Sequence, residues 1–242
     1  MLIKTKAIVL HSIPYNDNTN VVHLYTEEYG RMSYLASNLK NRNSGMRKAF
    51  FQPLSLIEIE ADHRGSRQLQ RINDVHCLYP FSGIPFDRTK NAISLFLAEV
   101  LYHSIRDTEK NPVLFDFIFQ SVQMLDLCEK GLANFHLVFL IKLTRYIGFY
   151  PNIEGQHDGW YFDLQGGVFV PYCPYHNAWL NPSDAQRFAR MLRINYDNMA
   201  AFKFEHNERV EILRQMLNYY RMHLSDFPTI KSLEILQEVF SD

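Results

Sequence analysis

The sequence predicts an α+β protein in which a small β-barrel is followed by an α-helical domain. Within the first 80 residues, short stretches of β-branched and aromatic residues alternate with turn residues. From residue 85 onward, apolar residues instead recur at the three- and four-residue spacing of a helix. Two prolines and a glycine interrupt both patterns between residues 79 and 85 (YPFSGIP). We therefore expect one domain over residues 1–80 and a second over residues 81–242.

Five strands are expected in the first domain. They cover residues 4–13, 21–26, 31–36, 50–61 and 68–78, and a long connection follows the third of them. Five short strands joined in this way suit a small closed or partly open barrel. The OB-fold is the best known barrel of this size, and it commonly binds oligonucleotides.

The second domain is expected to be helical, with one small inserted hairpin. Apolar positions predict a helix up to about residue 105, a second one that starts at Asn111-Pro112, and a third over residues 134–147 closed by Gly148. Residues 160–164 and 168–170 predict a hairpin within residues 150–182. Ser183 and Gln186 form a capping-box pattern that opens a further helix, and helices over residues 207–223 and after Pro228 follow.

Basic residues gather in two places of the first domain. Residues 1–80 hold ten Lys and Arg against seven Asp and Glu, a net charge of +3, whereas the remaining residues have a net charge of −4. One cluster lies in residues 39–48 (LKNRNSGMRK), and the other lies in and after the turn that precedes the fifth strand. This distribution favours a polyanion such as nucleic acid as the partner, although a solvated charged surface is the more common meaning of four basic residues in ten. The candidate phosphate-binding residues are Lys40, Arg42, Arg47, Lys48, Arg64, Arg67 and Arg71.

Three tyrosines are candidates for stacking on bases beside these cations. They are Tyr15, Tyr25 and Tyr34, and core or rim packing is the more common role of a tyrosine at such positions. Phosphate contacts would make the affinity depend on salt and only weakly on base sequence. The sequence contains no motif that enters a DNA groove, so direct reading of bases is not expected.

Signatures of common enzymes are absent from the sequence. It contains no GxxxxGK[ST] loop, no GxGxxG turn, no GxSxG elbow and no HExxH helix. Glu58 and Glu60 share one face of a predicted strand, where solvation is a simpler interpretation than acid–base chemistry. No apolar run is long enough to span a bilayer, and three widely spaced cysteines do not suggest a disulfide framework. We expect no catalytic residue, no cofactor and no membrane association.

One group of residues has the character of a metal site. Cys173 and His176 form a C-x-x-H pair, and His157 lies sixteen residues before the cysteine. A structural zinc site normally needs four ligands, and no convincing fourth ligand is present. The alternative interpretation is a small thiol and loop imidazoles in a tyrosine-rich hairpin.

Several short motifs, taken in order, resemble those of the RecO family of bacterial recombination mediators. They are Pro14-Tyr15, Tyr29-Gly30-Arg31, Phe51-Gln52-Pro53-Leu54, the segment Gly148-Phe149-Tyr150-Pro151-Asn152 after a long apolar helix, and the closing His223-Leu224 and Lys231-Ser232-Leu233. Each motif is short, but their order and spacing extend over most of the chain. The resemblance agrees with the division into barrel and helices.

The resemblance implies an N-terminal OB-fold, an α-helical domain and a function without covalent catalysis. Proteins of this family bind single- and double-stranded DNA, anneal complementary strands and act with RecR and, in some species, RecF. They place RecA on strands coated by single-strand-binding protein, whose acidic C-terminal tail they contact. The implied location is the cytoplasm of a bacterium, at the nucleoid. Many members carry a four-cysteine zinc site, of which only Cys173 and His176, with His157 nearby, remain here.

Two other functions remain as alternatives. An OB-fold module for structured RNA would prefer RNA to DNA of the same sequence through 2′-OH contacts. A metal-dependent hydrolase would use His157, Cys173 and His176 and would need stoichiometric metal.

Overall fold

The computed structural model describes residues 2–37, 49–64 and 67–240. The candidate residues Lys40, Arg42, Arg47 and Lys48 lie outside the described residues. The chain divides into two compact units, and each is considered by itself below. The first unit comprises Met1–Leu127 and Ile230–Leu236, and the second comprises Cys128–Thr229 and Gln237–Asp242. In the described ranges, no helix combines the length and the apolar character that a membrane span requires.

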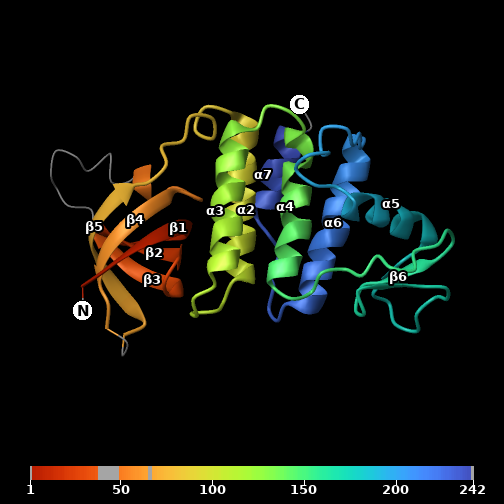
Figure 1. Ribbon diagram of the computed structural model, residues 1–242, viewed down its shortest axis with the longest axis horizontal. Helices are drawn as coiled ribbons and strands as arrows, with labels where there is room; N and C mark the ends of the chain where they lie inside the picture. The colour runs from red at the N-terminus through yellow and green to blue at the C-terminus, as the bar shows by residue number, and fades with distance from the viewer. Residues whose placement is uncertain (1, 38–48, 65–66, 241–242) are drawn as a thin grey trace. The chain divides into compact units, whose positions relative to one another are not determined.

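The first unit begins with a closed five-stranded barrel (Figure 1). Its strands close in the order β1-β2-β3-β5-β4; β3 and β5 pair in parallel, and the other neighbours pair antiparallel. The predicted fold class, an OB-type barrel followed by helices with a small β-element, is confirmed. The strands are β1 Leu2–Asn16, β2 Thr19–Thr26, β3 Gly30–Ser37, β4 Leu56–Asp62 and β5 Leu69–Cys77.

The barrel interior is filled by the inward half of each alternating strand. Residues such as Val9, Leu24, Ile57 and Ile59 are fully buried there. The fourth strand begins at Leu56 and not at residue 50 as predicted. The reason is that residues 54 and 55 bond to a bulged part of β1: the Leu54 amide donates to the Val9 carbonyl at 2.8 Å, and the Val9 amide donates to the Ser55 carbonyl at 3.1 Å.

Two long helices complete the first unit together with the start of a third. These are α2 Arg88–Ser104, α3 Pro112–Leu127 and α7 Ser232–Val239, and α2 contacts β1. The predicted cap at Asn111 is confirmed, since its Oδ1 accepts a hydrogen bond from the Leu114 amide at 3.0 Å. Glu99 of α2 accepts hydrogen bonds from the Lys231 amide at 2.9 Å and the Ser232 amide at 2.8 Å, and so caps the start of α7.

The second unit combines three helices with a small sheet. The helices are α4 Leu132–Tyr146, α5 Pro182–Leu192 and α6 His206–His223, and the strands are β6 Tyr161–Asp163, β7 Val168–Val170 and β8 Trp179–Leu180. The predicted hairpin is β6–β7, whereas β8, which pairs with β6, was not predicted. The helix α5 starts earlier than its capping-box pattern indicates. Asn181 is its N-cap and accepts from the Asp184 amide at 3.0 Å, because Pro182 favours the first helical position.

The compact first unit contains α2 and α3 as well as the barrel. Residue 80 therefore lies close to the end of the β-structure, at Cys77. Its role as a domain boundary stays a prediction.

Candidate nucleic-acid interface

The turn between β4 and β5 presents two of the predicted arginines. Arg64 and Arg67 lie on this turn and are exposed. A buried amide below them shapes the turn: Gln70 is 2% exposed, and its Nε2 donates to the carbonyls of Arg64 at 2.8 Å and Arg67 at 2.7 Å. Its Oε1 accepts from the Arg64 amide at 3.1 Å. The backbone carbonyls of Arg64 and Arg67 are thus both satisfied by one buried side chain.

The third predicted arginine, Arg71, differs from the other two because carboxylates surround it. It projects outward from β5 and lines a cavity of about 250 Å³ together with Asp62 and Asp74. Asp62 is also its direct neighbour on β4. Carboxylates close to Arg71 weaken its attraction for a phosphate.

Arg67 instead lines a cavity of about 530 Å³ together with Arg31 and Arg106. We call this cavity the arginine pocket. Its wall also includes Tyr29 and His63, whose rings stack with centroids 4.5 Å apart and an interplanar angle of 26°. Within the described part of the chain, no Asp or Glu lines the pocket. The pocket therefore combines positive charge, an aromatic pair and a concave shape.

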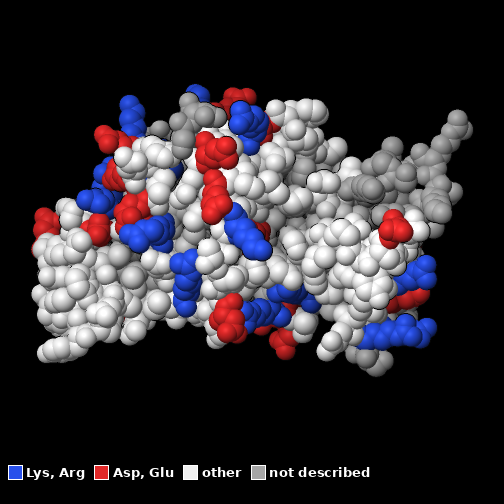
Figure 2. Space-filling model, turned by 180° about the vertical axis from the view of Figure 1, so that it is seen from behind, with Lys and Arg blue, Asp and Glu red and all other residues white. Residues whose placement is uncertain are grey.

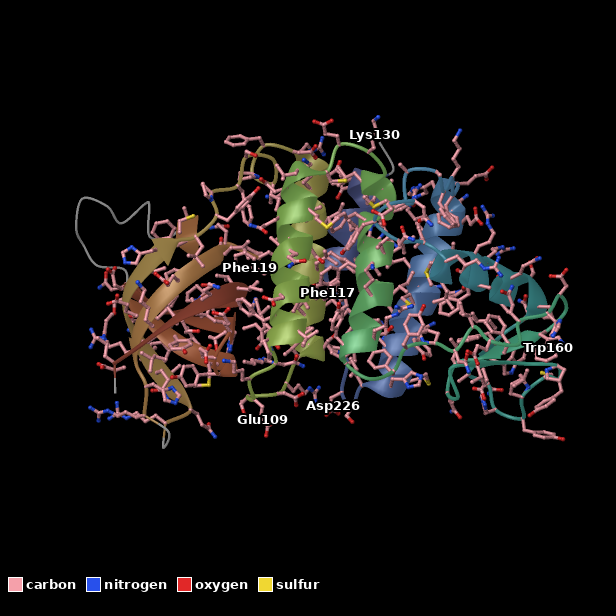
Figure 3. All side chains as sticks on the ribbon, in the orientation of Figure 1. Glu109, Phe117, Phe119, Lys130, Trp160 and Asp226 are labelled. Atoms are coloured by element: carbon pink, nitrogen blue, oxygen red, sulfur yellow. The ribbon has the colours of Figure 1, made fainter. Side chains whose placement is uncertain are left out.

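Gly30 brings Arg106 to the barrel. The φ angle of Gly30 is +58°, and a Cβ there would lie 2.5 Å from the Glu109 carbonyl oxygen and 2.8 Å from that of Asp107. The neighbouring Arg31 amide donates to the Asp107 carbonyl at 2.9 Å. The connection between α2 and α3, where Figure 3 labels Glu109, thus lies directly against the start of β3.

Arg31 has a structural role in the pocket wall. Its Nη1 donates to the carbonyls of Tyr102 at 2.7 Å and Ile105 at 2.8 Å, at the C-terminal end of α2. Its guanidinium also lies over the Tyr102 ring, 4.4 Å from the centroid. Burial lowers the pKa of Arg31, but an arginine so placed stays protonated and complements the negative end of the helix.

Three described lysines elsewhere on the first unit are paired with carboxylates, whereas the buried Lys90 donates to the backbone carbonyl of Asp126 at 2.6 Å. Lys4 contacts Glu58 at 2.9 Å and Lys6 contacts Glu27 at 3.1 Å. We call these four residues the paired edge. Lys110 similarly contacts Glu28 at 2.7 Å. Basic and acidic side chains are also interspersed on the face shown in Figure 2, where no large patch of one sign is visible. Carboxylates therefore neutralise part of the positive charge on the strands, and unneutralised positive charge among the described residues is confined to local regions of the first unit.

Two of the three tyrosines considered for base stacking lie in the protein interior. Tyr25 is 1% exposed and Tyr34 is fully buried in the barrel, so neither presents a ring to DNA. Burial raises the pKa of Tyr25 to about 12. Tyr15 is 66% exposed, and it lines a separate cavity near the β1–β2 turn. Tyr29, which the sequence did not single out for stacking, is the tyrosine that lines the arginine pocket.

The three metal candidates do not form a ligand set. The Nε2 of His176 lies 3.3 Å from Asp163 Oδ1, and its Nδ1 accepts from the Ala178 amide at 3.2 Å. His157 packs on Trp160, labelled in Figure 3, with ring centroids 4.8 Å apart. Cys173 is exposed. No group of three or more potential ligands was found among the described residues. The residues present do not fit a structural zinc site.

The order of the strands and the helices that follow them define a barrel-and-helix protein of the OB-fold type. Two family models match it in succession: "Recombination protein O N terminal" over residues 1–81 and "Recombination protein O C terminal" over residues 85–234. The chain belongs to the RecO family of DNA repair and recombination proteins.

Relatives match over their full length. The DNA repair protein RecO of Phocaeicola vulgatus is 44% identical over 241 residues, which span 100% of both chains. The protein of the same name from Azobacteroides pseudotrichonymphae is 43% identical over 240 residues, 99% of this chain and 100% of the relative. That of Flavobacterium psychrophilum is 36% identical over 242 residues, 100% of both.

Proposed function

We propose that this chain is a DNA-binding recombination mediator without catalytic chemistry of its own. It binds single- and double-stranded DNA and anneals complementary strands. With RecR, and in some species RecF, it promotes loading of RecA on DNA coated by single-strand-binding protein, whose C-terminal tail it contacts. The observation that carries the proposal is the full-length similarity to DNA repair proteins named RecO.

The barrel geometry supports a phosphate-binding role for the arginines of the β4–β5 turn. Arg64 and Arg67 stand on a backbone fixed by Gln70, and Arg67 shares the arginine pocket with Arg106. Arg71, close to two carboxylates, contributes less in this proposal. Lys40, Arg42, Arg47 and Lys48, outside the described residues, would add further phosphate contacts. Such contacts make binding weaken steeply as salt rises.

The proposal assigns no reaction to the carboxylates that the sequence raised as an acid–base pair. Glu58 forms an ion pair with Lys4, and Lys6 faces it across the two strands. The role of Glu58 is therefore explained by its ion pair on the barrel surface, without acid–base chemistry.

The test is annealing of complementary DNA oligonucleotides that are each coated with the cognate single-strand-binding protein. We expect the chain to accelerate annealing, and we expect the acceleration to disappear when the acidic tail of the coating protein is deleted. Unchanged annealing would contradict the mediator function. Tighter binding to RNA than to DNA of matched sequence would favour the RNA-binding alternative instead.

A further inference from the structure

We propose that the small sheet of the second unit, formed by β6, β7 and β8, folds without a metal ion. Two side chains of α6, Tyr219 and His223, stabilise it together with a buried aromatic core, in place of the zinc site that the family resemblance implies. The three candidate zinc ligands do not fit such a site, so other contacts must hold the strands. This inference goes beyond the proposed function and does not depend on DNA binding.

Among the candidate ligands, His176 already uses both of its ring nitrogens. Its Nδ1 accepts a hydrogen bond from the Ala178 amide at 3.2 Å, so the ring proton is on Nε2, which lies 3.3 Å from Asp163 Oδ1. Asp163 Oδ1 also accepts from the amides of Gln165 at 2.8 Å and Gly166 at 3.0 Å. A metal ion needs a nitrogen lone pair, and neither nitrogen of His176 offers one here. Zinc bound to His176 would have to displace an existing hydrogen bond.

The small sheet has an aromatic core of its own. Phe162 of β6 is fully buried, and the rings of Phe169 on β7 and Phe188 on α5 each have a centroid 4.9 Å from that of Phe162. The helix α5 contacts β8 and, as Figure 1 shows, β6. Small domains that bury too little apolar surface commonly depend on a metal or on disulfides. A sheet that packs these rings against a helix has apolar burial to stabilise it instead.

The turn between β6 and β7 is held at both of its ends by α6. Tyr219 and His223 are four residues apart and therefore share one face of the helix. At one end of the turn, His223 Nε2 donates to the Leu164 carbonyl at 2.9 Å. At the other end, the φ angle of Gly167 is +65°, and a Cβ there would lie 2.6 Å from Tyr219 Oη. The hairpin thus lies directly on the helix at this turn.

The segment that follows α4 completes this anchoring. The Tyr219 hydroxyl donates to the Phe149 carbonyl at 2.8 Å, and the Phe149 ring stacks on His223 with centroids 5.2 Å apart and an interplanar angle of 2°. The Asn152 amide donates to the Gly167 carbonyl at 2.8 Å. Two short motifs that carry the family resemblance, one ending at Asn152 and one beginning at His223, therefore meet beside the small sheet.

Metal analysis of the full chain tests whether the sheet folds without metal. The chain is produced without a metal-binding tag, and its zinc content is measured by plasma mass spectrometry. We expect much less than one zinc ion per chain. We also expect the same urea unfolding midpoint with and without EDTA, because removal of an ion bound only by the folded state would lower the stability. Stoichiometric zinc, or a midpoint that EDTA lowers, would overturn the proposal.

Hydrogen exchange tests the anchoring by α6. Tyr219→Phe removes only a hydroxyl group, and it should speed the exchange of amides in residues 161–170 about fivefold, as expected for the net loss of one hydrogen bond. Tyr175→Phe is the matched control, because Tyr175 is fully exposed and loss of its hydroxyl should leave this exchange unchanged. Equal exchange rates in the two variants would contradict the anchoring role of Tyr219.

Cys173→Ser tests the remaining candidate ligand. The thiol is exposed, so we expect its replacement to leave both the urea midpoint and the exchange of residues 161–170 unchanged. Faster exchange or a lower midpoint in this variant would point to a metal ligand at Cys173 and would overturn the proposal. None of these measurements uses DNA, so their failure would leave the proposed function untouched.

Discussion

The paired edge and the arginine pocket place similar charges in different settings. Lys4 and Lys6 project from a strand, and each meets a carboxylate within about 3 Å, at 2.9 and 3.1 Å. Arg67 and Arg106 lie on connections and share a concave wall that holds no carboxylate among the described residues. Lys110 and Glu28 also lie on connections and do form an ion pair, at 2.7 Å, so the surroundings of a side chain decide its pairing and not the type of element that carries it. The number of basic residues in a domain is therefore a poor measure of its cationic surface.

The largest effect is expected from a substitution that disrupts the contact between Gly30 and the segment that carries Arg106. Gly30→Ala places a Cβ at φ +58° against two backbone carbonyls, and backbone cannot yield as a flexible side chain does. We expect the free energy of unfolding to fall by about 3 kcal/mol, and DNA affinity to fall with it as Arg106 moves away. Urea unfolding monitors the stability.

Gly148→Ala is the control for that substitution. Gly148 also has a positive φ, +88°, but a Cβ there meets nothing within 4 Å. Only the strain of the left-handed backbone remains, with an expected loss of about 1 kcal/mol. Equal losses at the two glycines would show that the contact with residues 107–109 contributes nothing to stability.

The second prediction compares the two regions directly. Replacing both Arg67 and Arg106 by Gln should flatten the dependence of log affinity on log salt by about 1.4 for single-stranded DNA, about 0.7 for each phosphate contact. Replacing both Lys4 and Lys6 by Gln removes the same formal charge from the paired edge and should leave that slope unchanged. Fluorescence anisotropy over a salt series measures both. An equal change of the salt slope in the two double variants would show that the arginine pocket and the paired edge contribute equally to DNA binding.

The third and smallest effect concerns pH. Burial lowers the pKa of His11, His23 and His103 below the usual histidine value of 6.5, and the charge of Arg31 lowers each further. Glu99 opposes this for His11 and His103. In the unfolded chain these rings take up protons first, so stability is complete above about pH 6.5 and decreases as the pH falls below it.

The paired edge behaves differently, because its lysine titrates far from neutrality. A hydrogen bond to Glu58 raises the pKa of Lys4. Because the pKa values of His11 and His23 are lowered in the folded chain, both contribute to the decrease in stability between about pH 7 and pH 5.5. We expect this decrease to become smaller when both are replaced by Gln. Denaturant unfolding at the two pH values measures it. The same decrease in the original chain and the variant would exclude these histidines as its source.

The fold followed from local patterns to a large extent. Alternation within 80 residues predicted the five strands, and Asn111-Pro112 predicted the start of α3. The short strand β8 could not be predicted, because two residues carry no period and their pairing with β6 is a tertiary contact. The start of β4 was misplaced because Leu54 and Leu56 alternate with Ser55 in a strand-like pattern that continues through a backbone bend at Leu54.

The candidate site was predicted less completely than the fold. Charge pointed to Arg64 and Arg67, whose role in phosphate binding stays a prediction, but it could not show that Arg71 lies close to Asp62. Tyr34 was a stacking candidate by residue type, while closure of the barrel places it inside. Arg106 carried no signal in the sequence, because contacts of Gly30 and Arg31 with the segment after α2, far apart in the sequence, bring it to the barrel.

The cap that Glu99 provides for α7 can form only late when the chain is synthesised from its N-terminus. The first unit consists of residues 1–127 and a short segment from residues 230–236. The Glu99 carboxylate accepts from the Lys231 and Ser232 amides, which lie 132 and 133 residues further along the chain. Domains near the N-terminus generally fold first during translation. Here the Glu99 carboxylate lacks these donors until residues 231 and 232 have been synthesised, although α2 itself is made long before.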